Sequence, residues 1–290
     1  MSFSILNNMA GINAQNQLNL NSVNLNNTLL RMSSGKRINS GADDAAGLGI
    51  ADTLAANVRA LNQGVQNAND GISVAQIADG ALQQITSLLT RGVTLAEEAA
   101  TDTVDSTGKT ALNNELTSIK TEITRIATQT NYNGVSLFDQ AATSKLTAGQ
   151  MHVFVGDLAS QSSVSVNVGT LITAGSVTNL GGTILTPSDS TVSLTSAANA
   201  QSAITSLKTA IASVSSERAN IGAGINSLQS AVAVLQTQSQ NTTAAESNIR
   251  DANMAQEIAN MTKYQILAQS GIAALSQANQ SSQLVLKLLQ

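Results

Sequence analysis

Apolar residues at both ends of the chain recur at steps of four and three residues, the spacing that places them on one face of a helix. The C-terminal stripe runs from Met254 to Leu289 and is interrupted by three polar residues. Its large apolar members are Met254, Ile258, Met261, Ile272, Leu275, Leu286 and Leu289. A less continuous N-terminal stripe contains Ile5, Met9, Ile12, Leu25, Leu29 and Met32. Such stripes need partner helices to cover them, and we predict that they are polymerisation surfaces.

Longer apolar seams lie between the two ends. One runs from Leu54 to Ala100, interrupted only by Asp79 and Thr86, and predicts a helix on the order of 70–80 Å long. A short seam covers residues 112–126, and another covers residues 204–235, interrupted by Arg218. These seams can cover one another within one chain. The predicted fold is therefore mostly α: a long antiparallel coiled-coil-like helical bundle, with paired terminal helices and a small β-hairpin/loop insert.

Helix ends are marked by capping residues. Gly35 is a plausible C-cap of the first helix. The next helix is predicted to begin near Asp43, whose carboxylate can cap it, with Asp44 favourable at the positive helix end. A turn is expected near residues 105–109. The seam lapses at residues 239–246, as it does at 35–42, and both lapses are predicted to be hinges.

The period of the pattern changes in the middle of the chain. Tyr132-Asn133-Gly134-Val135 is a strong turn signal, because Asn-Gly favours the tight turn of a hairpin. Residues 151–155 and 163–168 are predicted strands, the second with strict alternation. The Ser-, Thr- and Gly-rich stretch that follows, to about residue 196, is expected to be a variable surface insert.

Composition favours packed helix surfaces over solvated ones. Charged residues make up 11% of the chain, and there is no Trp and a single Pro. The polar faces carry Asn, Gln, Ser and Thr, which fits burial in an assembly because interface cores are depleted in charge. The net charge of −4 without a basic stripe argues against a nucleic-acid partner. The longest apolar cluster is too short to span a membrane, and with no cysteine there is neither a disulfide nor a thiolate metal site.

No arrangement of residues predicts catalysis. His152 is the only histidine, lies in a predicted strand and is expected to be structural. Asp43 and Asp44 lack further ligands, so capping is a better interpretation than metal binding. Glycine-rich phosphate loops are absent from the sequence. We therefore expect no enzyme, no cofactor and no metal.

Residues 31–47, Arg-Met-Ser-Ser-Gly-Lys-Arg-Ile-Asn-Ser-Gly-Ala-Asp-Asp-Ala-Ala-Gly, closely resemble the N-terminal signature of bacterial flagellins. Further matches are residues 69–73, 129–135 and 260–280, in order and at family spacing. The resemblance covers roughly residues 1–140 and 200–290. It implies a hinge and signature formed by Ser33, Ser34, Gly35, Arg37, Ile38, Asn39, Asp43 and Asp44.

The resemblance implies a secreted structural subunit. Such a subunit is exported unfolded through the flagellar type III export apparatus and polymerises into the extracellular flagellar filament that drives swimming. The implied domains are an N-terminal region, 1–140 (inner-tube helix and hinge 1–40, outer-tube helices 41–140), a short variable insert, 141–199, and a C-terminal region, 200–290 (outer-tube helix 200–249, inner-tube helix 250–290). Implied partners are other copies of the chain, flagellar cap and hook-associated proteins, and a flagellin export chaperone that binds around residues 254–289. The alternative is a hook–filament junction protein, which shares similar termini.

Flagellins are also recognised by a vertebrate innate immune receptor through the first long helices of the outer bundle. The resemblance carries this contact onto Leu89, Arg91, Leu95 and Glu115, with Thr90 and Val93 replacing a glutamine and an arginine of the family pattern. The simpler interpretation is that Arg91 and Glu115 form a solvated ion pair. Separately, Ser and Thr residues of the insert are candidate O-glycan sites, and an unmodified polar loop is equally compatible with the sequence.

Overall fold

The computed structural model describes residues 8–138, 150–156, 163–168, 172–173, 176–177 and 192–288. Within these ranges the chain forms five helices and three two-stranded antiparallel sheets, which confirms the mostly α prediction. Two compact units divide it: unit 1 comprises residues 1–58 and 240–290, and unit 2 comprises residues 59–239. None of the described helices is long and apolar enough to cross a membrane.

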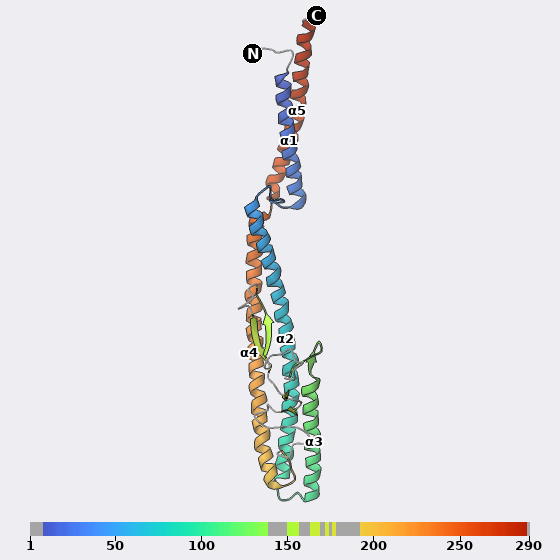
Figure 1. Ribbon diagram of the computed structural model, residues 1–290, viewed down its shortest axis with the longest axis vertical. Helices are drawn as coiled ribbons and strands as arrows, with labels where there is room; N and C mark the ends of the chain where they lie inside the picture. Colours follow the sequence, from blue (N-terminus) through green and yellow to red (C-terminus); the bar gives the residue numbers. More distant parts are fainter. Residues whose placement is uncertain are drawn as a thin grey trace. The chain divides into compact units, whose positions relative to one another are not determined.

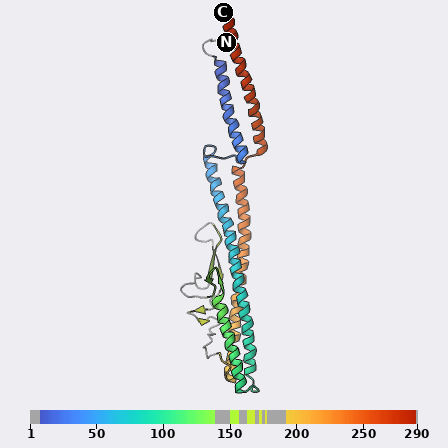
Figure 2. The same ribbon diagram turned by 90° about the vertical axis from the view of Figure 1, so that its right-hand side faces the viewer.

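Unit 1 is built on two antiparallel helices, α1 (Met9–Ser34) and α5 (Met254–Leu288), which lie side by side in both views (Figures 1 and 2). Contacts at both ends of the pair establish its direction. Asn8 Nδ2 donates to Asn279 Oδ1 over 3.3 Å at one end, and Arg31 lies 3.9 Å from Glu257 at the other. The predicted C-cap is confirmed, since Gly35 ends α1 in the left-handed conformation at φ 70°.

The long helices α2 (Ala45–Ala99) and α4 (Ala197–Arg250) correct one prediction. The seam of α4 does lapse at residues 239–246, but the helix continues to Arg250, and the chain leaves the helix only between α4 and α5. A lapse in the apolar pattern removes burial, whereas Gln, Ala and Thr remain compatible with a helix. The lapse coincides instead with the boundary between units at 239/240.

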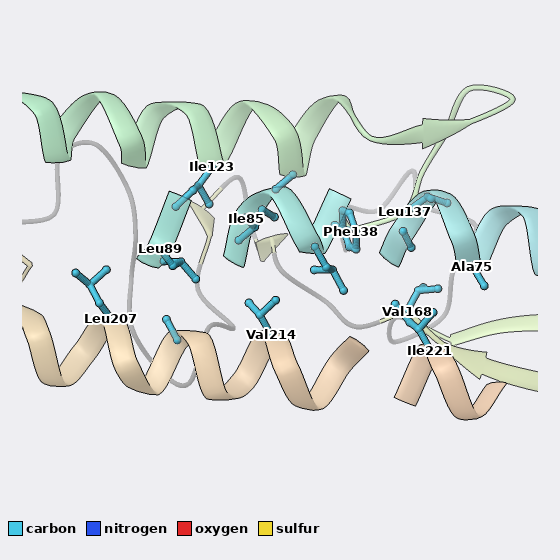
Figure 3. Packing of buried hydrophobic residues seen from close by; sticks show 14 of the residues in the cluster. Ala75, Ile85, Leu89, Ile123, Leu137, Phe138, Val168, Leu207, Val214 and Ile221 are labelled. Carbon is cyan, nitrogen blue, oxygen red and sulfur yellow. The ribbon is translucent and has the colours of Figure 1, made fainter. Parts of the chain in front are cut away.

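Unit 2 packs α2 between α3 (Ser106–Gln129) and α4. The predicted seams form its core: Ile85 and Leu89 from α2, Ile123 from α3 and Leu207 from α4 are fully or nearly fully buried, as Figure 3 shows. The turn before α3 lies earlier than predicted. Asp105 is the N-cap of α3, with its Oδ1 accepting from the backbone N–H of Gly108 at 2.7 Å, so residues 106–109 are already helical.

The polar interruptions of two seams meet each other. Arg218 on α4 donates to both carboxylate oxygens of Asp79 on α2, from Nε at 2.7 Å and from Nη2 at 3.2 Å. This hydrogen-bonded pairing raises the pKa of the Arg218 guanidinium further above its ordinary value. Both side chains remain about one third exposed, so the pair lies at the edge of the core.

The predicted turn and strands are confirmed. β1 (Asn131–Tyr132) and β2 (Val135–Ser136) form a hairpin whose two turn residues, Asn133 and Gly134, have φ of 49° and 78°. Positive φ at both central residues is the type I′ requirement that favours Asn-Gly. β3 (Gln150–Phe154) and β4 (Ser163–Asn167) form a second hairpin, and the short strands β5 (Ile172–Thr173) and β6 (Ser176–Val177) form a third.

The β3–β4 hairpin packs against α2 and α4 at glycine positions, where no side chain separates it from the helix backbone. A Cβ at Gly71 of α2 would come within 2.6 Å of Val153, and one at Gly224 of α4 within 2.6 Å of Val166. Both valines are buried. Glycine therefore allows the hairpin to contact the helix backbones, and part of the predicted insert belongs to the core of unit 2. His152, in β3, is exposed.

Candidate functional site: the terminal helix pair and its hinge

The α1–α5 pair has almost no apolar core of its own. Among the described residues of unit 1, Ile38 and Ala51 are the buried hydrophobic side chains, and neither belongs to α1 or α5. The side chains that this pair buries are polar: Asn21 and Thr28 on α1 and Glu257 on α5. The pair therefore gains little of the hydrophobic stabilisation that normally holds two helices together.

The outward surfaces of the pair are apolar instead. Of the large hydrophobic side chains exposed in the described residues, twelve lie in unit 1 and four in unit 2. Those on α1 and α5 are Met9, Ile12, Leu20, Val23, Leu29, Leu30, Met254, Ile258, Ile266, Leu267 and Ile272, with exposed fractions from 41% to 60%. Large apolar side chains that gather, exposed, on one pair of helices are typical of an interaction site.

The N-terminal stripe turns out to be two faces and not one. Leu25 and Met32 are half-buried on the side that faces α5, whereas Met9 and Ile12 lie on the opposite, exposed side. Continuing from Ile12 at helical spacing leads to Val23 and Leu30. The abundant asparagines of this segment leave too few apolar residues to show the change of face, so the sequence pattern resembles a single stripe.

The C-terminal stripe lies partly on the side of α5 that faces α1 and partly on its exposed side. Met261 and Leu275 are half-buried beside α1, while Met254, Ile258 and Ile272 are exposed. Leu29 of α1 is likewise 44% exposed. Ile5 and Leu289 lie outside the described residues, and for Leu286 only the backbone is described. The sequence-predicted polymerisation residues thus divide into some that hold the pair together and some that remain uncovered.

The signature residues form a compact loop between α1 and α2, at the position of the predicted hinge. The backbone N–H of Arg37 donates to the carbonyl of Arg250 at 2.7 Å, and the N–H of Ala252 donates to the carbonyl of Gly35 at 2.9 Å. Lys36 and Asp251 form the β-bridge between them. The guanidinium of Arg37 also donates to the carbonyl of Ile249 at 2.8 Å. Two segments far apart in sequence are therefore tied together by their backbones.

The residue that caps α2 is Asp44 and not Asp43. Asp44 caps α2, since its Oδ1 accepts from the N–H of Gly47 at 2.9 Å. Asp43 folds back instead and accepts from the N–H groups of Asn39 and Ser40 and from the Ser40 hydroxyl, all at 3.0–3.2 Å. The predicted capping by Asp43 is therefore wrong: its carboxylate fixes the loop and not the helix.

The hydrogen bonds from Ser40 hold the pKa of the Asp43 carboxyl below its ordinary value of 3.8, helped by Asn39 and by the nearby Arg31. Arg31 Nη2 lies 3.5 Å from Asp43 Oδ1.

Other signature residues also have defined places in this loop. Ile38 is buried at 2% exposure and would contact any side chain placed at Gly47. Ser34 Oγ accepts from the N–H of Lys36 at 3.1 Å, and Ser33 is exposed.

Several charged residues around the hinge are not marked by any pattern in the sequence. Arg31 lies between Asp43 and Glu257, and Arg250 Nη1 donates to Asp52 Oδ1 at 3.0 Å. Spacing alone gives little signal for the pairs Arg31–Glu257 and Arg250–Asp52, because their partners come from opposite ends of the chain. The scarcity of charge was the available clue: Arg31 is the sole charged residue of α1, and an isolated charge in such a helix needs a partner.

The candidate receptor contact is not one surface. Arg91 is exposed and donates to Glu115 Oε1 from Nε at 3.0 Å and from Nη2 at 2.8 Å. Leu89 and Leu95, however, are 0% and 1% exposed and belong to the core of unit 2. Only the ion pair is therefore accessible on the folded chain, so the two leucines support this surface from within.

Within the described residues, no cluster of His, Cys, Asp or Glu could hold a metal ion. The chain is similar to the family model described as the bacterial flagellin N-terminal helical region over residues 5–143, and to the C-terminal helical region over residues 204–289. It is 34% identical to a flagellar filament 30.7 kDa core protein of Treponema maltophilum over 97% of this chain and 98% of that protein.

A flagellin of Halalkalibacterium halodurans is 35% identical, with 97% of this chain and 98% of the relative covered. A flagellin of Listeria monocytogenes is 34% identical over the same shares. Among solved structures, a crystal structure of Bacillus cereus flagellin is 30% identical, with a TM-score of 0.49, and the match covers 62% of this chain and 94% of that one. On the family models and the near-complete relatives, the chain belongs to the bacterial flagellin family.

Proposed function

We propose that the chain is a structural subunit that polymerises, through the exposed faces of α1 and α5, into the extracellular filament of the bacterial flagellum. One observation carries the proposal: the terminal pair leaves most of its large apolar side chains exposed, and the side chains that it buries fully are polar. Relatives along the whole chain are named as flagellins and flagellar filament core proteins. None of those relatives supports the alternative of a hook–filament junction protein.

Charged substitutions on the outer face of α1 test the proposal. Val23 and Leu30 are 56% and 58% exposed, so aspartates there leave the single chain intact. Val23→Asp with Leu30→Asp should abolish seeded polymerisation, measured by sedimentation, while helicity by circular dichroism stays that of the wild type. Ile77→Asp is the matched control, since Ile77 is a 42% exposed aliphatic residue of unit 2. Normal polymerisation of the double variant would refute the proposed surface.

An export chaperone that covers α5 before assembly follows from the same exposure, because a free apolar helix is an aggregation hazard. Ile272 is 59% exposed and directly accessible, whereas Leu275 is half-buried beside α1. A chaperone that contacts both Ile272 and Leu275 must displace α1. Ile272→Asp with Leu275→Asp should therefore lose chaperone binding in calorimetry, and an unchanged affinity would contradict this partner.

Passage through the flagellar type III export apparatus and growth beneath cap and hook-associated proteins belong to the same proposal. For the innate immune receptor, Arg91 and Glu115 remain the accessible candidates. We expect weak binding by monomer and none by the intact filament, with Arg91→Ala reducing monomer binding in surface plasmon resonance. Nanomolar binding, or no effect of Arg91→Ala, would show that this surface is not the contact.

O-glycosylation of the insert is tested by intact mass. Ser163 at the start of β4 is exposed, whereas most other candidate residues lie outside the described ranges. A filament subunit of 29.7 kDa would exclude modification.

A further inference from the structure

We propose that Asn21 is a positioning residue that fixes the register in which α1 and α5 pair. The inference rests on the proposed function, because register matters only if the outer faces of the two helices act together in assembly. The residues of α1 that face α5 include Gly11, Ala14, Leu18 and Leu25, and those of α5 include Ala268, Gly271, Leu275 and Ala278. Faces made of so few large side chains give little steric discrimination against sliding by one heptad.

Asn21 makes a buried hydrogen bond between the two helices. It is 9% exposed, and its Nδ2 donates to the backbone carbonyl of Tyr264 at 2.8 Å. Its Oδ1 is also buried, and no partner for that atom is present among the described residues. A buried acceptor without a partner costs stability. An asparagine at this position is therefore not explained by stability alone. A single buried asparagine in a helix pair is known to select one register at a cost in stability.

Neighbouring contacts agree on that register. Leu18 lies over Gly271, where a Cβ would come within 2.8 Å of Leu18 Cδ1. Glu257, the fourth residue of α5, is buried and has Arg31 at 3.9 Å. A slip of seven residues would remove Leu18 from the space beside Gly271 and Glu257 from its cation. Asn21 would at the same time lose the Tyr264 carbonyl, so the polar and steric contacts reinforce one another.

The fixed register has a consequence for the exposed faces. Each helix has its own exposed apolar residues: Val23 and Leu30 on α1, and Ile258 and Ile266 on α5. Sliding one helix by a heptad shifts these stripes against each other by about 10 Å. Identical subunits can repeat the same contacts only if every copy presents the same alignment.

The absence of cysteine from the chain allows a direct test by disulfide trapping. Asn8→Cys with Asn279→Cys reports the observed register, since the two asparagines are hydrogen-bonded. Asn8→Cys with Ile272→Cys reports a slip of seven residues. Each pair is placed in the full-length chain, and intrachain disulfide formation is measured in dilute monomer, where even transient pairing is trapped.

In the wild-type background, the observed-register pair should form its disulfide faster than the slipped pair. Asn21→Leu should raise the slipped-to-observed ratio of rates about fivefold or more, because the selecting hydrogen bond is lost. Asn21→Gln, which retains a donor, should restore much of the preference. Asn19→Leu, an exposed asparagine of the same helix, is the control for added apolar surface.

An unchanged ratio in Asn21→Leu, or an equal change in Asn19→Leu, would overturn the proposal. These readings do not depend on polymerisation. A normal filament from the Val23 and Leu30 double variant would refute the proposed assembly surface and leave the register measurement standing, so the two failures are distinguishable.

Discussion

At the scale of single residues, one ion pair accounts for two polar interruptions of the apolar seams. Asp79 and Arg218 were visible in the sequence only as interruptions of α2 and α4, and the structure shows that each is the other's partner. Periodicity gives the face of one helix but not its alignment with the next, so the pairing could not be read from spacing. Two interruptions of opposite charge were the available signal.

Removing one member of this pair should destabilise unit 2 modestly. Asp79→Ala leaves Arg218 without its carboxylate, and because both side chains are about one third exposed, the expected loss in the free energy of unfolding is about 0.5–1 kcal/mol. Urea denaturation of both single variants and of the double variant would give the coupling energy. A coupling of zero would mean that the two groups are separately solvated and contribute nothing as a pair.

Asp43 should make the hinge sensitive to acid. Its pKa is lower in the folded chain than the ordinary 3.8, so its stabilising contribution is fully present above 3.8 and is lost as the pH falls through the lowered value. Asp43→Asn should therefore weaken the hinge at neutral pH and flatten its response to acid. Amide hydrogen exchange at Asn39 and Ser40 reports this directly, and an unchanged acid response would exclude Asp43 as its source.

At the scale of elements, the helices were largely predictable and their junctions were not. The seams of α2, α3 and α4 follow from burial within unit 2, where sequence period and packing coincide. The N-terminal stripe misled because α1 uses Asn21 and Thr28 on its inner face and keeps Val23 and Leu30 outside. Hinge contacts such as that of Arg250 with Asp52 join distant segments, and local patterns contain no information about them.

The glycine contacts predict which element is most easily displaced. Gly71→Leu places a side chain where Val153 now lies, which should push the β3–β4 hairpin away from α2 at a cost of about 1–3 kcal/mol. Ser73→Leu is a suitable control, because Ser73 is an exposed residue of the same helix. Limited proteolysis of the hairpin should accelerate only in the glycine variant. Equal proteolysis rates would mean that the hairpin does not depend on this close contact.

At the scale of the whole molecule, stability should be distributed unevenly between the two units. Nearly all of the buried hydrophobic side chains belong to unit 2. In dilute monomer we expect slow amide exchange there and fast exchange in residues 9–34 and 254–288, with protection of those helices appearing on polymerisation. Strong protection of the terminal helices in the monomer would contradict this distribution, and with it the need for neighbouring copies.

The polar layer inside the α1–α5 pair also has a mechanical consequence. A chain pulled by either end first meets two helices whose buried side chains are the polar Asn21, Thr28 and Glu257. The apolar side chains on their paired faces, such as Leu25 and Leu275, are only half-buried. Little hydrophobic surface is exposed to water when they separate, so the ends should come apart at lower force than the bundle of α2, α3 and α4. The weak contacts of the terminal pair would thus give a translocating motor a low-resistance place to begin, and the same helices would acquire their strength only from neighbours after delivery.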